Sequence, residues 1–179
     1  MIPFEEYCKK VARHIEERYG IRVVTRDVPD PLLGDLNGSE IHIDYAVTPE
    51  QRLFLLAHLF GHTVQWNAQP DTIELGRPRE IPVPEAMLPS LMDYERGAAE
   101  YALSMLREIG IREVDHLEIE QWLSNFSACD MAYLRHYYVT GKKRSFESFW
   151  REDASLIQPR PIPAFRVTRH AWRSDGIVI

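Results

Sequence analysis

Two histidines four residues apart, His58 and His62, are the side chains of this 179-residue chain whose spacing most directly suggests chemistry. On an α-helix, side chains four residues apart lie on the same face, so both imidazoles can bind one metal ion. This spacing is the ligand half of the motif His-Glu-x-x-His. In that motif, the Glu after the first histidine takes a proton from the water that the metal activates. Here that position holds Leu59, which cannot accept a proton.

The histidine pair lies in a segment whose pattern predicts a buried helix. Thr48-Pro49-Glu50-Gln51 combines an N-cap residue, a proline at the first helical position and a glutamine at N3. Apolar side chains then surround the helix on nearly all sides as far as Trp66, which predicts a central position in the fold. Gly61 costs a helix interior about 1 kcal/mol relative to alanine. We therefore expect another element to pack closely against it.

The remaining patterns predict an α+β fold that is mostly helical, with a small mixed β-sheet. A first amphipathic helix is expected from Phe4 to Tyr19, before Gly20. Strands are expected at residues 21–28 and 40–45, with residues 32–36 pairing through the turn Asn37-Gly38-Ser39. Further helices are expected at residues 90–109, 115–126 and 127–139. The proline-rich segment 69–89 is expected to be largely irregular, as a loop across the mouth of the site.

Composition and charge limit the classes of function. The net charge of -6 and the pI near 5.6 argue against nucleic-acid binding by the whole chain, because phosphate contacts require a basic surface. Cys8 and Cys129 form no CxxC motif, which is typical of reduced thiols in the cytoplasm. The absence of a long apolar run predicts a protein without a membrane span. We therefore expect a cytoplasmic protein.

The charge also divides the chain. Residues 141–179 contain eight Lys and Arg against four Asp and Glu, whereas the preceding part is acidic. We expect one domain at residues 1–140, followed by a basic, proline-containing extension at residues 141–179. The extension either packs on the domain, with Phe165 and Trp172 as anchors, or trails from it.

Three segments together resemble the ImmA/IrrE family of metallopeptidases. They are Ile41-His42-Ile43-Asp44, then Glu50-Gln51-Arg52 leading into Leu56-Ala57-His58-x-x-Gly61-His62, then Glu95-x-x-Ala98-x-x-Tyr101-Ala102. The resemblance covers about residues 15–105. It implies a zincin-like core and a zinc ion held by His58, His62 and Glu95. Two imidazoles and one carboxylate would leave one position open for water.

Two positions depart from the pattern of the family. Leu59 replaces the general base, and Ala99 replaces an Asn that supports the site. A general base typically raises the reaction rate about 10²- to 10⁴-fold. Efficient hydrolysis would therefore need another residue to act as the base. The candidates are Glu74, Glu85, Glu100, and His136 with Tyr137 and Tyr138. Glu100 lies about 140° around the helix from Glu95, so it should not point at the same metal ion. The run His136-Tyr137-Tyr138 is more typical of core packing than of catalysis.

Three functions follow, of which the first is favoured. The chain is a catalytically impaired, metal-binding metallopeptidase-like protein, a pseudoenzyme, that acts in protein or peptide recognition or regulation. Alternatively, it is an active zinc-dependent peptidase with a relocated base. The third interpretation is a metal-free regulatory or structural module, because a bare His-x-x-x-His can also be two hydrogen-bonded core histidines.

The resemblance also indicates a kind of partner. Family members often cleave helix-turn-helix repressors or work with toxin-like modules, so it implies a transcriptional regulator or a toxin–antitoxin-like component. The chain shows no helix-turn-helix pattern of its own, which argues against direct binding to nucleic acid.

Overall fold

The computed structural model describes residues 2–29, 33–76, 78, 80–111 and 115–170, and their fold is α+β and mostly helical, as predicted. The helices are α1 (Phe4–Tyr19), α2 (Pro49–Ala68), α3 (Leu88–Glu108) and α4 (His116–Thr140). The strands are β1 (Arg22–Thr25), β2 (Gly34–Leu36) and β3 (Glu40–Ile43). Short 3₁₀ helices are η1 (Pro70–Glu74), η2 (Glu85–Met87) and η4 (Phe146–Phe149). Within the described residues, no helix is both long and apolar enough to cross a lipid bilayer.

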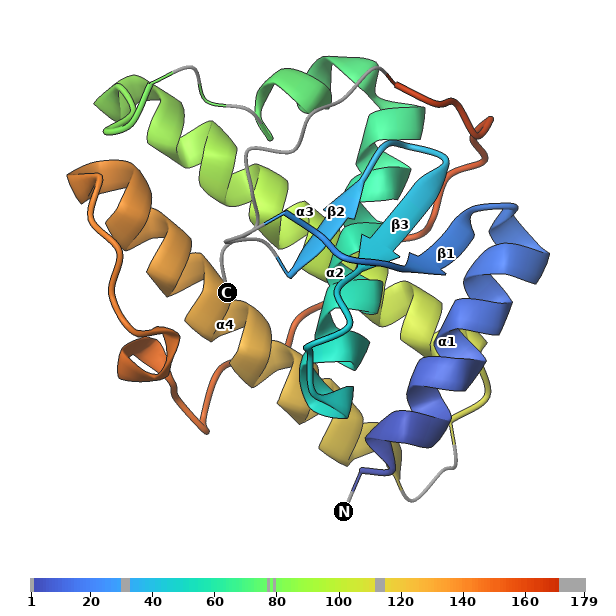
Figure 1. The fold of residues 1–179 in the computed structure, drawn as a ribbon. Helices are drawn as coiled ribbons and strands as arrows, with labels where there is room; N and C mark the ends of the chain where they lie inside the picture. Colours follow the sequence, from blue (N-terminus) through green and yellow to red (C-terminus); the bar gives the residue numbers. More distant parts are fainter. Residues whose placement is uncertain (1, 30–32, 77, 79, 112–114, 171–179) are drawn as a thin grey trace.

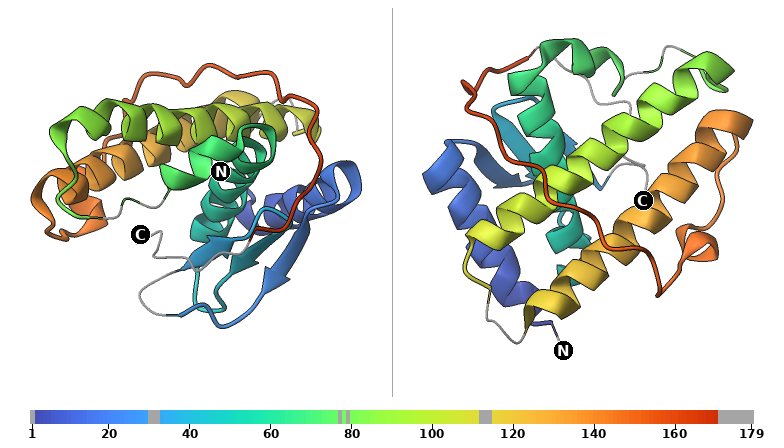
Figure 2. Two further views of the ribbon diagram at one scale, coloured as in Figure 1. Left: turned by 90° about the horizontal axis from the view of Figure 1, so that it is seen from above. Right: turned by 180° about the vertical axis from the view of Figure 1, so that it is seen from behind.

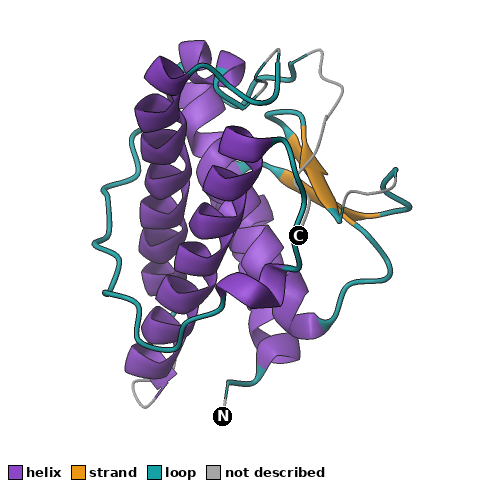
Figure 3. Cartoon of the chain, turned by 90° about the vertical axis from the view of Figure 1, so that its left-hand side faces the viewer, coloured by secondary structure: helices purple, strands orange, loops and turns teal. Residues whose placement is uncertain are grey.

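Helix α2 occupies the centre of the fold (Figure 1), with the sheet to one side of the helices (Figure 3). Every residue from Leu53 to Trp66 is buried, which confirms the predicted central position. The predicted capping box is present. Thr48 Oγ1 accepts a hydrogen bond from the Gln51 amide at 3.2 Å, and Gln51 Oε1 accepts one from the Thr48 amide at 3.0 Å. The start of the helix that carries both histidines is therefore fixed by local sequence.

The sheet has the strand order β1-β3-β2. β1 pairs with β3 in parallel, and β2 pairs with β3 antiparallel through the predicted Asn37-Gly38-Ser39 turn. Asn37 Oδ1 accepts hydrogen bonds from the amides of Ser39 and Glu40 at 3.0 and 2.9 Å, which closes this turn. The strands are shorter than the sequence pattern suggested, and Ile41 and Ile43 of the middle strand are fully buried.

Helices α2 and α3 approach each other closely at Gly61, as the isolated glycine predicted. A Cβ atom placed on Gly61 would lie 2.6 Å from the carbonyl carbon and 2.7 Å from the Cα of Ala98, distances that real Cβ atoms essentially never show. Two side chains of α2 bind Tyr94 of α3. Gln65 Nε2 donates to the Tyr94 carbonyl oxygen, and Trp66 Nε1 donates to Tyr94 Oη, both at 2.7 Å. The residue next to Tyr94, Glu95, is thereby held against α2.

The prediction of two helices at residues 115–126 and 127–139 was wrong, because α4 is one continuous helix. Ser124 and Asn125 favour helix ends, since their side chains can compete for backbone hydrogen bonds. Here these side chains have other partners. Ser124 Oγ donates to the Glu120 carbonyl of the preceding turn at 2.7 Å, and Asn125 Nδ2 donates to the Glu152 carbonyl at 3.1 Å. The helix ends at Gly141, with φ of 66°, as predicted.

The chain after α4 returns across the outer face of α3 (Figure 2), without regular secondary structure over residues 150–170. Arg160 forms an ion pair with Glu100 at 2.6 Å, and its amide donates to the Glu100 carbonyl at 3.3 Å. The ring of Phe165 stacks on Tyr19 of α1 with a centroid separation of 6.0 Å. As far as residue 170, the extension is therefore in contact with the preceding domain.

The second expected anchor, Trp172, lies outside the described residues. The described residues between α2 and α3 are largely irregular, as predicted, apart from η1 and η2. Its Val83 amide donates to the Tyr138 carbonyl at 2.9 Å, which joins the segment to the end of α4.

We predict that Gly61→Ala lowers the free energy of unfolding by about 1–3 kcal/mol, the usual cost of overpacking. Helix propensity alone would give the opposite sign, a gain of about 1 kcal/mol. Denaturant unfolding of the metal-free protein measures the difference. Arg96→Ala, an exposed change on the facing helix, serves as the control and should change stability little. A stabilised Gly61→Ala variant would show that α2 and α3 do not meet as described.

Candidate metal site

The structure brings together the three side chains that the sequence singled out. His62 Nε2 lies 3.0 Å from His58 Nε2 and 3.1 Å from Glu95 Oε2, and His58 Nε2 lies 3.4 Å from the same carboxylate oxygen. The three residues are 2, 3 and 5 % exposed, in the order His58, His62, Glu95. Two ring nitrogens and one carboxylate oxygen therefore converge on one buried point between α2 and α3.

The spacing of these donor atoms suits a small divalent ion. Zinc binds histidine nitrogen and carboxylate oxygen at about 2.0–2.2 Å, so the donor atoms of a tetrahedral site lie about 3.3–3.6 Å apart. The separations of 3.0–3.4 Å are near this range. The donor set also fits, because imidazole and carboxylate are ordinary zinc ligands. These three residues are thus able to hold a metal ion.

His62 is oriented by a hydrogen bond on its other ring nitrogen. Its Nδ1 lies 2.9 Å from Gln65 Oε1, and an amide oxygen can only accept, so Nδ1 carries a proton. When the ring is neutral, Nε2 is therefore the nitrogen that can bind a metal. Gln65 is fixed in turn by its bond to the Tyr94 carbonyl. Support of this kind for a histidine ligand is a general property of metal sites, since it sets the tautomer and the orientation of the ring.

His58 is held by packing. Its ring stacks on Phe54, with centroids 5.3 Å apart and planes inclined by 20°, and Phe54 stacks on Phe126 of α4. The Nδ1 atom of His58 is buried and has no hydrogen-bond partner among the described residues. His58 therefore presents Nε2 to the site without a polar partner behind it.

The electrostatics of the site favour an ionised Glu95. Burial alone raises the pKa of this carboxyl, but the charge interaction with His62 and the hydrogen bonds from the His58 and His62 rings outweigh it and lower the pKa to about 2. Glu95 is therefore an anion at neutral pH.

Leu59, which stands where the motif His-Glu-x-x-His has its Glu, is fully buried. Its Cδ1 atom lies 2.9 Å from the point where a Cβ of Gly34 would be, so it packs between α2 and strand β2. Ala99, the second departure, is also buried.

The side chains proposed as a replacement base lie outside the group formed by His58, His62 and Glu95. Glu74 and Glu85 are exposed. Glu100 forms its ion pair with Arg160. His136 contacts the Thr140 hydroxyl at 3.4 Å and the ring of Phe149.

One carboxylate near the site was missed. Asp130 of α4 is 1 % exposed, and its Oδ2 atom lies 3.9 Å from His58 Nε2. Burial raises the pKa of this carboxyl to about 7, with attraction to His58 opposing the rise and the negative Glu95 adding to it. A signal was present in the sequence. Asp130 lies four residues after Phe126 and four before Leu134, which places a carboxylate on the apolar face of a helix.

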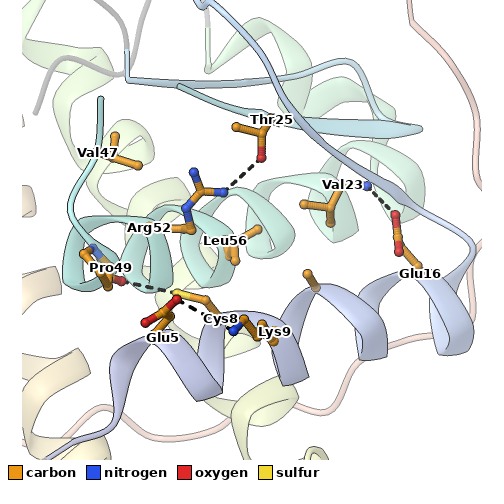
Figure 4. Close-up of a pocket in the computed structure, with 11 residues that line it drawn as sticks. Glu5, Cys8, Lys9, Glu16, Val23, Thr25, Val47, Pro49, Arg52 and Leu56 are labelled. Carbon is orange, nitrogen blue, oxygen red and sulfur yellow. Dashed lines mark hydrogen bonds and ion pairs between the residues drawn. The ribbon is translucent and has the colours of Figure 1, made fainter. Parts of the chain in front are cut away.

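A surface pocket elsewhere in the fold lies between α1, β1 and the start of α2 (Figure 4). Its polar side chains have partners within the protein, since Arg52 Nη1 donates to Thr25 Oγ1 at 3.0 Å and Cys8 Sγ donates to the Pro49 carbonyl at 3.3 Å. Burial raises the pKa of the Cys8 thiol to about 11, so it is protonated and unreactive at neutral pH. The pocket offers neither a metal-binding group nor an activated nucleophile.

Comparison of the chain with protein-family models, with curated proteins and with solved structures found no match. The assignment of the site therefore depends on the geometry and chemistry of the residues described above.

Proposed function

We propose that this protein binds a divalent metal ion, most naturally zinc, through His58, His62 and Glu95, and that it is a catalytically impaired relative of zincin-like metallopeptidases. Its role is recognition of a protein or peptide. The convergence of two Nε2 atoms and a carboxylate oxygen within 3.4 Å of one another is the observation that carries the metal site. The ImmA/IrrE resemblance supports the architecture and suggests a transcriptional regulator or a toxin–antitoxin-like component as partner.

Two features support the loss of hydrolysis. A bound zinc ion would supply Lewis acidity, but a peptidase also needs a proton acceptor beside the water that is activated. Leu59 cannot accept a proton and lies in an apolar interface. All three ligand residues are also at least 95 % buried, which is more typical of a closed, structural metal site than of one that admits a polypeptide.

An active hydrolase with a relocated base is the second candidate, because the structure does place one further carboxylate near His58. Asp130 is the acidic group concerned, whereas the residues first considered for this role lie elsewhere. The distinction between the two functions is therefore a question of activity, and it can be measured directly.

The first test concerns metal. We expect protein purified without an affinity tag to contain about one equivalent of zinc, and His62→Ala to lose it, because two remaining ligands hold zinc weakly. Elemental analysis after dialysis provides the measurement. His136→Ala is the matched control, since it removes a histidine outside the site and should leave the metal content unchanged. Equal, negligible metal in wild type and His62→Ala would favour the metal-free module instead.

The second test concerns chemistry. The wild type should show no metal-dependent cleavage of an unstructured protein such as casein, and Leu59→Glu should create a low activity by adding a carboxylate beside the site. We expect the increase in cleavage rate to be smaller than the 10²- to 10⁴-fold rate increase that is typical of a general base. The new carboxyl would be buried against β2, where desolvation raises its pKa and lowers stability.

Leu59→Gln is the control for this test, because it has the same size and polarity but no basic group. It should be destabilised without gaining activity. Cleavage by the wild type that a chelator inhibits and His58→Ala abolishes would contradict the pseudoenzyme and establish the relocated base.

A further inference from the structure

Asp130 is a buried carboxylate that neither the motif nor the family resemblance assigns. It projects from the middle of α4, a helix outside the segments that carry the resemblance. Both of its oxygens are buried, and neither has a hydrogen-bond partner among the described residues. A buried carboxyl group without hydrogen bonds is costly, and the neighbouring His58 ring, at 3.9 Å, compensates it only in part. Its position therefore requires an explanation.

The direction from which Asp130 approaches His58 is informative. Carboxylates that support a histidine ligand usually bind the ring nitrogen opposite to the metal. Asp130 lies instead near Nε2, the nitrogen that also faces His62 and Glu95, at a distance of 3.9 Å. The opposite nitrogen, Nδ1, has no hydrogen-bond partner in the described part of the chain. Asp130 is thus on the metal side of His58 rather than behind it.

The charge of the site is a second reason to assign Asp130 to it. With two neutral imidazoles and one carboxylate, a divalent ion would leave a net charge of +1 in a site whose residues are nearly inaccessible to water. A second carboxylate makes the whole group neutral, and neutrality matters most where water cannot screen a charge.

We propose that Asp130 is the fourth protein group of the metal site, and that it supplies the second carboxylate that neutralises a buried divalent ion. This inference depends on the proposed metal binding by His58, His62 and Glu95. Its consequence is structural, because the ion then joins α4 to the pair α2 and α3. Asp130 is not among the donors that lie within 4.8 Å of one another, so in this arrangement it compensates the charge of the ion from beside His58.

The variant Asp130→Asn tests this role, because it removes the charge and keeps the size. We expect the dissociation constant for zinc, measured by competition with a chromophoric chelator, to rise by at least about tenfold, the lower end of the range for groups that support a metal site. In excess chelator, the melting temperature of Asp130→Asn should equal or exceed that of the wild type, since a buried carboxylate without hydrogen bonds has been removed. The zinc-induced rise in melting temperature should shrink.

Ser127→Ala is the matched control. Ser127 lies one turn earlier on α4, and its hydroxyl is also buried without a hydrogen-bond partner among the described residues. This variant should bind zinc as the wild type does. Asp130→Ala provides a second neutral variant, with the same expected loss of affinity, in case the asparagine amide disturbs folding.

The inference is overturned if Asp130→Asn and Asp130→Ala bind zinc as tightly as the wild type while His62→Ala does not; the proposed metal site would then stand without Asp130. It is also overturned if both Asp130 variants melt at lower temperature in chelator, because the residue would then act through the fold alone. Zinc bound equally by wild type and His62→Ala would instead contradict the proposed function, since the metal would lie elsewhere.

Discussion

The close packing of α2 against α3 at Gly61 determines the geometry of the site. Only glycine allows the two backbones to meet there, since any Cβ would collide with Ala98. At this separation, Glu95 of α3 reaches the histidines of α2 within 3.1–3.4 Å. The same contact brings Gln65 to the Tyr94 carbonyl, and Gln65 in turn orients His62. One glycine thus links backbone packing to both the position and the tautomer of a ligand.

The four polar side chains at this contact, His58, His62, Glu95 and Asp130, are costly to bury unless their charges are compensated. Two carboxylates and two imidazoles lie between apolar layers, with each of the four residues at most 5 % exposed. Hydrogen bonds satisfy part of the group, but both oxygens of Asp130 and the Nδ1 of His58 have no such partner in the described structure. The donor atoms of His58, His62 and Glu95 are able to hold a divalent cation, which would compensate the anionic charge.

Much of this arrangement could be predicted from the sequence because it depends on local signals. The capping box at Thr48, the helix stop at Gly141 and the hairpin turn at Asn37 are fixed by neighbouring residues, and all are present. The histidine pair follows directly from helical periodicity. The contact between the histidine pair and Glu95 could be expected only from the family resemblance. Local sequence does not indicate which distant segments will pack together.

The parts that were missed depend on tertiary structure. The break predicted between Phe126 and Ser127 does not occur, because both residues are buried within one continuous helix and Phe126 stacks on Phe54 of α2. Asp130 was overlooked because a single aspartate in a helix is usually exposed to solvent. Only the packing of α4 against α2, with Phe126 stacked on Phe54, places it beside His58. A polar residue on an apolar helical face was the sole sign of its role.

The most direct test of the metal site is an anomalous difference map from crystals of the zinc-loaded protein, recorded at the zinc absorption edge. The account predicts one strong peak between α2 and α3, at about 2.0–2.2 Å from His58 Nε2, His62 Nε2 and a Glu95 carboxylate oxygen. A peak at any other group of residues, or no peak in protein that contains stoichiometric zinc, would contradict it.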